Sequence, residues 1–137
     1  MGHPTRLLII DDEEPFTRLS KMLLEDEGYV VETLNDPTHS VETACRFKPD
    51  LIILDVIMPQ KSGIEVGQEI QDNIQTKDIP ILFLTAAISM DNHAAWDSGM
   101  EGITYTIEDD ILLNRPVLVK PVDAGEIMAK VQEILAG

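Results

Sequence analysis

Two apolar runs in this sequence end directly on acidic residues. The run Leu7–Ile10 is followed by Asp11 and Asp12. The run Leu51–Leu54 is followed by Asp55. Two carboxylates about 4 Å apart repel each other by roughly 4 kcal/mol at an effective dielectric constant of about 20, so several of them in one place need a cation. Carboxylate oxygens with no histidine or cysteine beside them favour Mg²⁺. A carboxylate in such a site can also attack phosphorus and form an aspartyl phosphate.

Two further polar residues stand at the ends of apolar runs. Thr85 ends the run Ile81–Leu84, and Lys120 follows Val117–Val119. Phosphoryl transfer needs mainly positioning and charge neutralisation, which a metal ion, an ammonium group and a hydroxyl group supply. Asp55 is the better nucleophile candidate, because it leaves its run alone while the acidic pair can hold the metal. A single aspartate after a strand is usually a turn residue or helix cap. The prediction therefore depends on these residues ending four different predicted strands.

The elements that must position these residues are short strands and helices in alternation. The four apolar runs have four residues or fewer and are rich in Ile, Leu and Val, which is typical of strands buried on both faces of a parallel sheet. The more mixed segment Tyr29–Thr33 suits an edge strand. Strand and helix alternate about five times, which predicts a doubly wound α/β fold with helices on both faces. Ligands of such folds sit at the carboxyl edge of the sheet, where all the polar residues above would meet.

The helices between the strands are predicted from spacing and boundary residues. The first begins at Pro15 and ends at Gly28, and the second begins with Asp36 as N-cap. The buried face of the first helix is predicted to carry Phe16, Leu19 and Leu23. The third helix is predicted to bury Val66, Ile70 and Ile74. The last is predicted to begin with a capping box of Asp123 and Glu126 and to bury Ile127, Val131 and Ile134. A further helix is predicted around Ser89–Ser98.

Composition limits the possible functions. With 137 residues, 44% of them hydrophobic, the chain is expected to form one domain over residues 1–137. The formal net charge of −15 opposes contact with phosphate backbones and anionic membranes, so direct nucleic acid binding and membrane binding are not expected. Cys45 is the sole cysteine, which favours a reducing, cytoplasmic setting. The sequence shows neither a signal peptide nor a membrane-spanning run.

The motifs together resemble the receiver domain of two-component response regulators. The matching stretches are, in order, "LLIIDDEEPFTR", "PDLIILDVIMPQKSG", "IPILFLTA" and "VLVKP". The resemblance covers nearly the whole chain and implies a flavodoxin-like, five-stranded parallel sheet in the order 2-1-3-4-5. The chain departs from the family pattern by an insertion over residues 100–114, before the last strand. A small hairpin is expected there, and a short helix at Asp109–Asn114 is the alternative.

The resemblance assigns a role to each acidic residue. Asp55 would be the phosphoacceptor and a Mg²⁺ ligand. Asp12 would bind the metal directly, and Asp11 would hold it mainly through water. The backbone carbonyl of Ile57 would be a further metal ligand.

The resemblance also assigns roles around the acids. Thr85 would hydrogen-bond the phosphoryl group, and Lys120 would pair with one of its oxygens. Pro121 would follow a cis peptide bond. In the loop after the acceptor, Pro59 and Gly63 match the family pattern, and the glycine would supply an unusual backbone angle.

Three positions bear on the switch and on the lifetime of the phosphoryl group. Val117 occupies the switch position at which the family usually has an aromatic residue, so the usual coupling of threonine to aromatic residue is not expected here. Ile57 and Ala87 stand where family members influence the attack of water, and neither side chain can hydrogen-bond water. Slow self-dephosphorylation is therefore expected.

Three functions compete. The first is a phosphorylation switch, in which a sensor histidine kinase or a phosphotransfer protein modifies Asp55 and the altered surface acts on a downstream protein or effector domain. Its output would be signalling, not enzymatic turnover, and homodimers could form through the fourth helix, fifth strand and fifth helix.

The second function is a phosphorylation-independent interaction module that docks through the insertion. The third is a metal-dependent phosphohydrolase, disfavoured because such enzymes commonly carry a second acid where Ile57 stands. A stand-alone receiver and a domain of a longer protein both stay open.

Overall fold

The computed structural model describes residues 2–85 and 115–136, and its centre is a five-stranded parallel sheet. The strands lie in the order β2-β1-β3-β4-β5, which confirms the order expected from the resemblance. Their bounds are β1 Arg6–Ile10, β2 Val30–Leu34, β3 Leu51–Asp55, β4 Ile81–Thr85 and β5 Val117–Val119. All four neighbouring pairs are parallel, so the carboxyl ends of the strands meet at one edge of the sheet.

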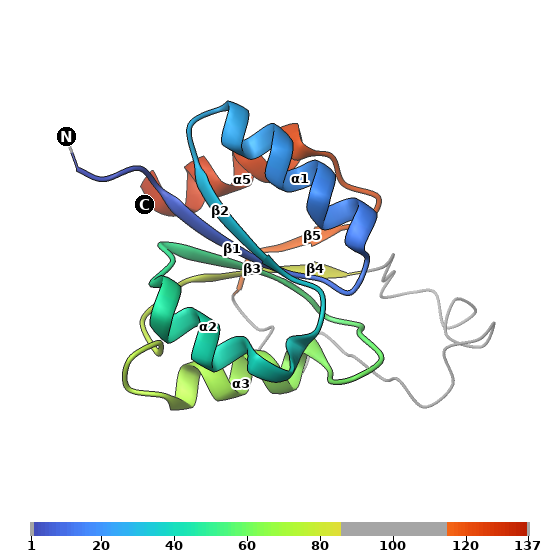
Figure 1. Cartoon of the computed structure of the whole chain (residues 1–137), viewed down its shortest axis with the longest axis vertical. Coiled ribbons are helices and arrows are strands. Elements are labelled where there is room, and N and C mark those ends of the chain that lie inside the picture. Colours follow the sequence, from blue (N-terminus) through green and yellow to red (C-terminus); the bar gives the residue numbers. More distant parts are fainter. Residues whose placement is uncertain (1, 86–114, 137) are drawn as a thin grey trace.

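Helices cover both faces of the sheet. Figure 1 shows α1 and α5 on one face and α2 and α3 on the other. Their bounds are α1 Glu14–Asp26, α2 Ser40–Phe47, α3 Gly63–Asp72 and α5 Ala124–Ala136, and the 3-10 turn η1 Pro37–His39 precedes α2. The predicted helix at Ser89–Ser98 and the predicted insertion at residues 100–114 lie outside the described residues.

The core consists of two apolar layers, one on each face of the sheet. Strands β1, β3 and β4 are almost wholly buried, as predicted from their short aliphatic runs. The layer under α2 and α3 includes Leu8, Ile52, Val66 and Phe83. The layer under α1 and α5 includes Leu7, Ile53, Leu82 and Val131. By contrast, β5 presents exposed Val117 and Val119, so the expectation of burial on both faces fails at this edge strand.

The buried face of α1 differs from the prediction. Leu19 and Leu23 are exposed, whereas Thr17, Ser20 and Leu24 are buried. The buried set has the same helical spacing but is rotated by one residue. The small side chains of Thr17 and Ser20 let the helix lie close to the sheet, and a hydrogen bond from the Thr17 hydroxyl to the Glu14 carbonyl (3.1 Å) satisfies part of its polarity. Phe16 packs against the core as predicted, so apolar bulk predicted one of the three residues correctly and was wrong for Leu19 and Leu23.

The end of α3 also differs from the prediction. Val66 and Ile70 are fully buried, but Ile74 is 83% exposed because the helix ends at Asp72. Asn73 adopts an extended backbone, and its side-chain oxygen accepts a hydrogen bond from the backbone N–H of Gln75 at 2.8 Å. This local turn competes with the helix and carries Ile74 away from the core.

Other predicted boundaries hold. Gly28 follows α1 with φ +102°, a left-handed angle that glycine adopts without strain. Asp36 caps the turn η1 by accepting from the backbone N–H of Thr38 at 2.9 Å. The capping box of α5 is present, with the Glu126 N–H donating to Asp123 Oδ1 at 2.8 Å. Ile127 and Val131 are fully buried beneath it, as predicted.

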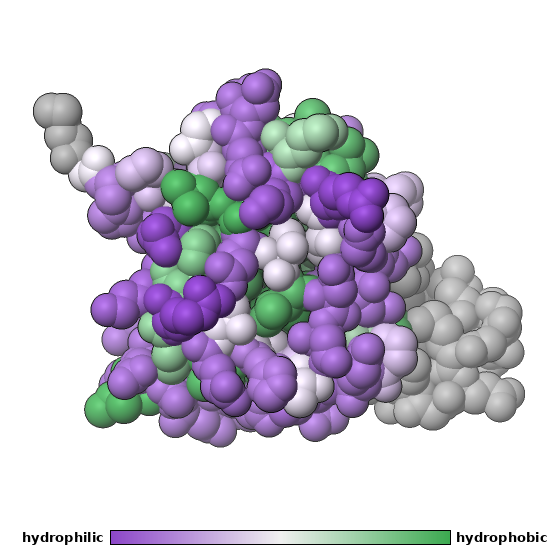
Figure 2. All heavy atoms as spheres, in the orientation of Figure 1, coloured by the Kyte–Doolittle hydropathy of each residue, from purple (hydrophilic) through white to green (hydrophobic). Residues whose placement is uncertain are grey.

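The surface agrees with an acidic, hydrophilic chain. Figure 2 shows hydrophilic residues over most of the visible face, with apolar groups in scattered patches. Across residues 2–85 and 115–136, the helices are all too short or too polar to cross a bilayer.

Candidate functional site

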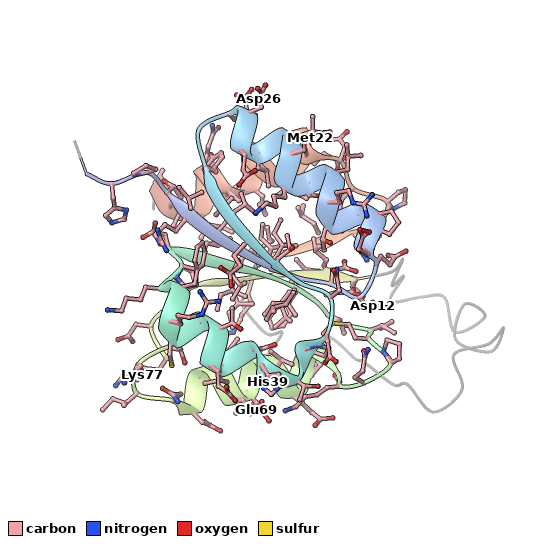
Figure 3. The ribbon with its side chains drawn as sticks, in the orientation of Figure 1. Asp12, Met22, Asp26, His39, Glu69 and Lys77 are labelled. Carbon is pink, nitrogen blue, oxygen red and sulfur yellow. The ribbon has the colours of Figure 1, made fainter. Side chains whose placement is uncertain are left out.

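The carboxyl edge of the sheet gathers the predicted site residues. Hydrogen bonding continues beyond the strands, from the Asp11 N–H to the Leu34 carbonyl at 3.0 Å. At the other side of the edge, the Lys120 N–H donates to the Thr85 carbonyl at 2.7 Å. Figure 3 labels Asp12 at this end of the sheet, where β1 passes into α1. These backbone hydrogen bonds join the ends of β1 and β2 on one side of the edge and the ends of β4 and β5 on the other.

Three carboxylates form the centre of the site. One oxygen from each of Asp11, Asp12 and Asp55 lies within 4.8 Å of the other two. Asp11 is 0% exposed and Asp55 is 3% exposed, while Asp12 is half-buried. Water therefore screens the charges of Asp11 and Asp55 poorly, and either a cation or a proton on one of the carboxylates has to relieve their repulsion.

Lys120 supplies positive charge beside this cluster. Its Nζ lies 2.7 Å from Asp11 Oδ2, 2.8 Å from Glu13 Oε1 and 3.7 Å from Asp55 Oδ1. The ammonium group also lies 5.0 Å from the centre of the Phe16 ring, within the range of a cation–π contact. Lys120 is followed by a cis peptide bond to Pro121, as the resemblance implied.

The crowding changes the titration of the acids. Burial, and then the neighbouring charge of Asp11, raise the pKa of Asp55 to about 8, with Lys120 acting in the opposite direction. Burial also raises the pKa of Asp11 above its ordinary value, against the contact with Lys120. For Lys120, burial works to lower the pKa, but the contacts with Asp11 and Glu13 outweigh it and raise the pKa.

The acidic cluster fits a hard divalent cation. Asp11 Oδ2 is buried and finds no partner with hydrogen-bond geometry among the described residues, although Lys120 lies close to it. All three side chains of the cluster offer oxygen, the ligand that Mg²⁺ prefers. The donor set of the cluster therefore fits Mg²⁺, with Asp11, Asp12 and Asp55 as the side chains that would hold it.

Gly63 is required at the site for space. Gly63 is the first residue of α3, and its N–H donates to the Val56 carbonyl at 2.8 Å. A Cβ at this position would collide with the Asp55 carbonyl oxygen and would lie 2.8 Å from the Asp55 carbonyl carbon. Gly63 does not have a positive φ, so the expected unusual backbone angle is wrong. Glycine is needed because the start of the helix lies directly against the backbone of Asp55.

The remaining predicted residues lie on β4, on β5 and in the loop after β3. Thr85 is buried at the end of β4, and Val117 begins β5. Ile57 is half-buried and packs against the core, and Pro59 is exposed in the loop between β3 and α3. The role of the Ile57 carbonyl stays a prediction, and Ala87 lies outside the described residues.

Two residues of the site were missed in the sequence, Glu13 and Asn35. Glu13 contacts Lys120, as described above. The Asn35 side-chain amide donates to the Asp11 carbonyl at 2.9 Å and to the Thr17 hydroxyl at 2.8 Å, tying the start of α1 to the end of β2. Asn35 directly follows β2, so the rule that strand ends share one edge could have identified it. No comparable pattern in the sequence predicts that Glu13 contacts Lys120.

A parallel sheet in this order with acids and a lysine at its carboxyl edge defines a receiver-type α/β domain. The sequence model of the response regulator receiver domain matches residues 7–111, so the chain belongs to the response regulator receiver family. That match ends before β5, so it does not include Lys120, which directly follows this strand.

Similar proteins agree with this assignment. The chain is 35% identical over 131 residues to the DNA-binding dual master transcriptional regulator RpaA of Synechocystis, with 95% of this chain and 48% of RpaA covered. It is 33% identical to response regulator MprA of Mycobacterium leprae, with 90% and 56% covered. The crystal structure of a putative response regulator from Chloroflexus aurantiacus matches with 27% identity and a TM-score of 0.74, covering 98% of this chain and 99% of that one. Chemotaxis protein CheY4 of Vibrio cholerae matches with 26% identity and a TM-score of 0.74, covering 96% and 98%.

These relatives correct the expectation about nucleic acid. The chain spans about half the length of the curated relatives it matches. One of them is named DNA-binding, and others are named transcriptional regulators, so excluding nucleic acid as a partner was wrong. The physical reason is that the charge of −15 counts only this chain and says nothing about the remaining half of such a protein.

Proposed function

We propose that this domain is a phosphorylation switch in which Asp55 accepts a phosphoryl group. The donor would be a sensor histidine kinase or a phosphotransfer protein. The observation that carries the proposal is the buried Asp55 carboxylate beside Asp11, Asp12 and the Lys120 ammonium at one edge of the sheet. Membership of the receiver family supports the same assignment.

The proposed chemistry is an in-line displacement at phosphorus. A carboxylate oxygen of Asp55 forms a bond to phosphorus while the bond from phosphorus to the donor histidine nitrogen breaks, and that nitrogen keeps the electron pair. Mg²⁺, held by Asp11, Asp12, Asp55 and the Ile57 carbonyl, would neutralise charge on the transferring group. Lys120 would bind one phosphoryl oxygen, and the Thr85 hydroxyl would bind another.

The output of the domain would be signalling and not turnover. RpaA and TrcR are named as transcriptional regulators, which supports a downstream effector that controls gene expression. A cytoplasmic setting, where kinases of this class transfer phosphate, is part of the proposal. Slow self-dephosphorylation is part of it as well, because the Ile57 side chain cannot hold an attacking water by a hydrogen bond.

Intact-mass spectrometry after incubation with acetyl phosphate and Mg²⁺ tests the proposal. We expect one phosphoryl group on the wild type and none on Asp55→Asn. Asp72→Asn is the matched control, because it makes the same change at an exposed position at the end of α3 and should be labelled like the wild type. The rate at which the label decays after donor removal measures the lifetime.

A phosphorylation-independent interaction module is the competing function. It predicts no label from acetyl phosphate and none from a cognate kinase, with partner binding unchanged in Asp55→Asn. Label on the wild type that disappears in Asp55→Asn would exclude it.

A further inference from the structure

Glu13 contacts Lys120, and the phosphoryl transfer proposed above does not use this contact. Its Oε1 lies 2.8 Å from Lys120 Nζ, whereas the nearest oxygen of Asp55 lies 3.7 Å away. The ammonium group is therefore closer to Glu13 and Asp11 than to the proposed acceptor. A phosphoryl group on Asp55 would have to attract this same ammonium group.

The position of Glu13 in the chain shows that its side chain does not serve the helix. Glu13 stands at the N-cap of α1, where Asp, Asn or Ser would hydrogen-bond the first turn, yet within the described structure its side chain makes no capping bond. Its backbone is fixed on both sides, because its N–H donates to Asp11 Oδ1 at 2.9 Å and its carbonyl accepts from the Thr17 N–H at 3.1 Å. The longer glutamate side chain reaches across to Lys120 instead.

We propose that Glu13 is a positioning residue that competes with the phosphoryl group on Asp55 for Lys120. This inference rests on the proposed function of Asp55. Formation of the aspartyl phosphate adds negative charge beside Lys120, so the ammonium group would exchange one partner for a phosphoryl oxygen. Glu13 is the partner that water can replace, because its side chain is 61% exposed, whereas Asp11 is fully buried. Glu13 would thus hold Lys120 in a resting position until the acceptor is modified.

The test compares initial rates of labelling by acetyl phosphate in Mg²⁺ for the wild type, Glu13→Gln and Glu13→Asp. Glu13→Gln removes the competing charge, and Glu13→Asp keeps the charge but shortens its reach. We expect both variants to be labelled about two- to fivefold faster, which corresponds to loss of one exposed ion pair. Glu14→Gln is the matched control, because it removes the neighbouring charge, whose contact is with Arg18, and should keep the wild-type rate. The midpoint of thermal unfolding should not fall in Glu13→Asp, since aspartate is a better N-cap.

Each other outcome would overturn the inference. If Glu13→Gln and Glu14→Gln are both labelled faster to the same extent while Glu13→Asp matches the wild type, Glu13 acts only through overall charge. Slower labelling of the Glu13 variants would mean that Glu13 assists Lys120 and does not compete for it. A labelled wild type with unchanged Glu13 variants would overturn this inference and leave the proposed function standing. A wild type without label, from acetyl phosphate and from a cognate kinase, would overturn both.

Discussion

The charged groups at the amino end of the sheet have well-matched partners, whereas those at its carboxyl end do not. At the amino end, the Arg6 N–H donates to Asp50 Oδ2 at 2.8 Å, and the Arg6 guanidinium donates to the Phe47 carbonyl at 2.9 Å. The guanidinium also lies 4.2 Å from the centre of the Phe47 ring. Here the guanidinium is satisfied by the carbonyl and the ring of Phe47, and Asp50 accepts from the backbone N–H of Arg6, so the contacts close the end of the sheet and contribute stability.

At the carboxyl end, negative charge is in excess. Lys120 faces carboxylates from Asp11, Glu13 and Asp55, and Asp12 completes the cluster. The pKa of Asp55 is raised to about 8 by burial and by the neighbouring charge of Asp11. The carboxyl end is therefore the less stable of the two, as expected for the cation and phosphoryl site that we propose there.

Neutralising one acid at each end should change stability in opposite directions. In metal-free buffer near pH 8, Asp55→Asn should raise the free energy of unfolding by about 1 to 4 kcal/mol, because it removes a poorly compensated buried charge. Asp50→Ala should lower it by about 1 kcal/mol, because the Arg6 N–H loses its acceptor. Urea denaturation with a chelator present measures both. Equal losses in the two variants would contradict the contrast between the ends.

Gly63→Ala should destabilise the carboxyl end specifically. The added methyl group meets the backbone of Asp55, so we expect a loss of about 1 to 3 kcal/mol together with slower labelling by acetyl phosphate. Gly125→Ala is the control, because its Cβ would meet only a flexible side-chain oxygen of Asp123 at 3.2 Å. Denaturation and intact mass measure the two effects. Normal labelling of Gly63→Ala would show that the helix start can move without disturbing the acceptor.

The raised pKa of Asp55 predicts how stability depends on pH. The folded carboxyl keeps its proton up to about pH 8, whereas the unfolded one loses it near the ordinary value of 3.8. The stabilisation is therefore complete at low pH and is lost as the pH rises between these values, by up to about 1.4 kcal/mol per pH unit. Without metal, the wild type should lose stability relative to Asp55→Asn across this window, as measured by urea denaturation at a series of pH values. A constant difference would show that Asp55 titrates normally.

Asn35→Ala should have the smallest effect. Loss of its hydrogen bonds to the Asp11 carbonyl and the Thr17 hydroxyl should cost about 1 kcal/mol of stability and weaken Mg²⁺ binding in calorimetry. Thr17→Val removes only the second bond and serves as the control, with Mg²⁺ affinity closer to that of the wild type. Should both variants bind Mg²⁺ equally well, the contact with Asp11 would have no part in positioning the metal site.

Much of the architecture was predictable because local patterns agree with it. Short aliphatic runs predicted the central strands, and the capping box of Asp123 and Glu126 predicted the start of α5. The strand order came from the resemblance to receivers and is confirmed. The face of α1 was not predictable from apolar bulk, because burial of Thr17 depends on a hydrogen bond from Asn35. The exposure of Ile74 depends on the turn at Asn73.

The sequence by itself determined which residue types stand at the end of each strand. Since parallel strands place their carboxyl ends on one edge, the convergence of Asp11, Asp55 and Lys120 follows from their order along the chain. Tertiary structure decided which acid the lysine contacts, how far the acids are buried and why position 63 must be glycine. Those properties depend on distances between segments remote in sequence, and electrostatic energy varies with both distance and burial.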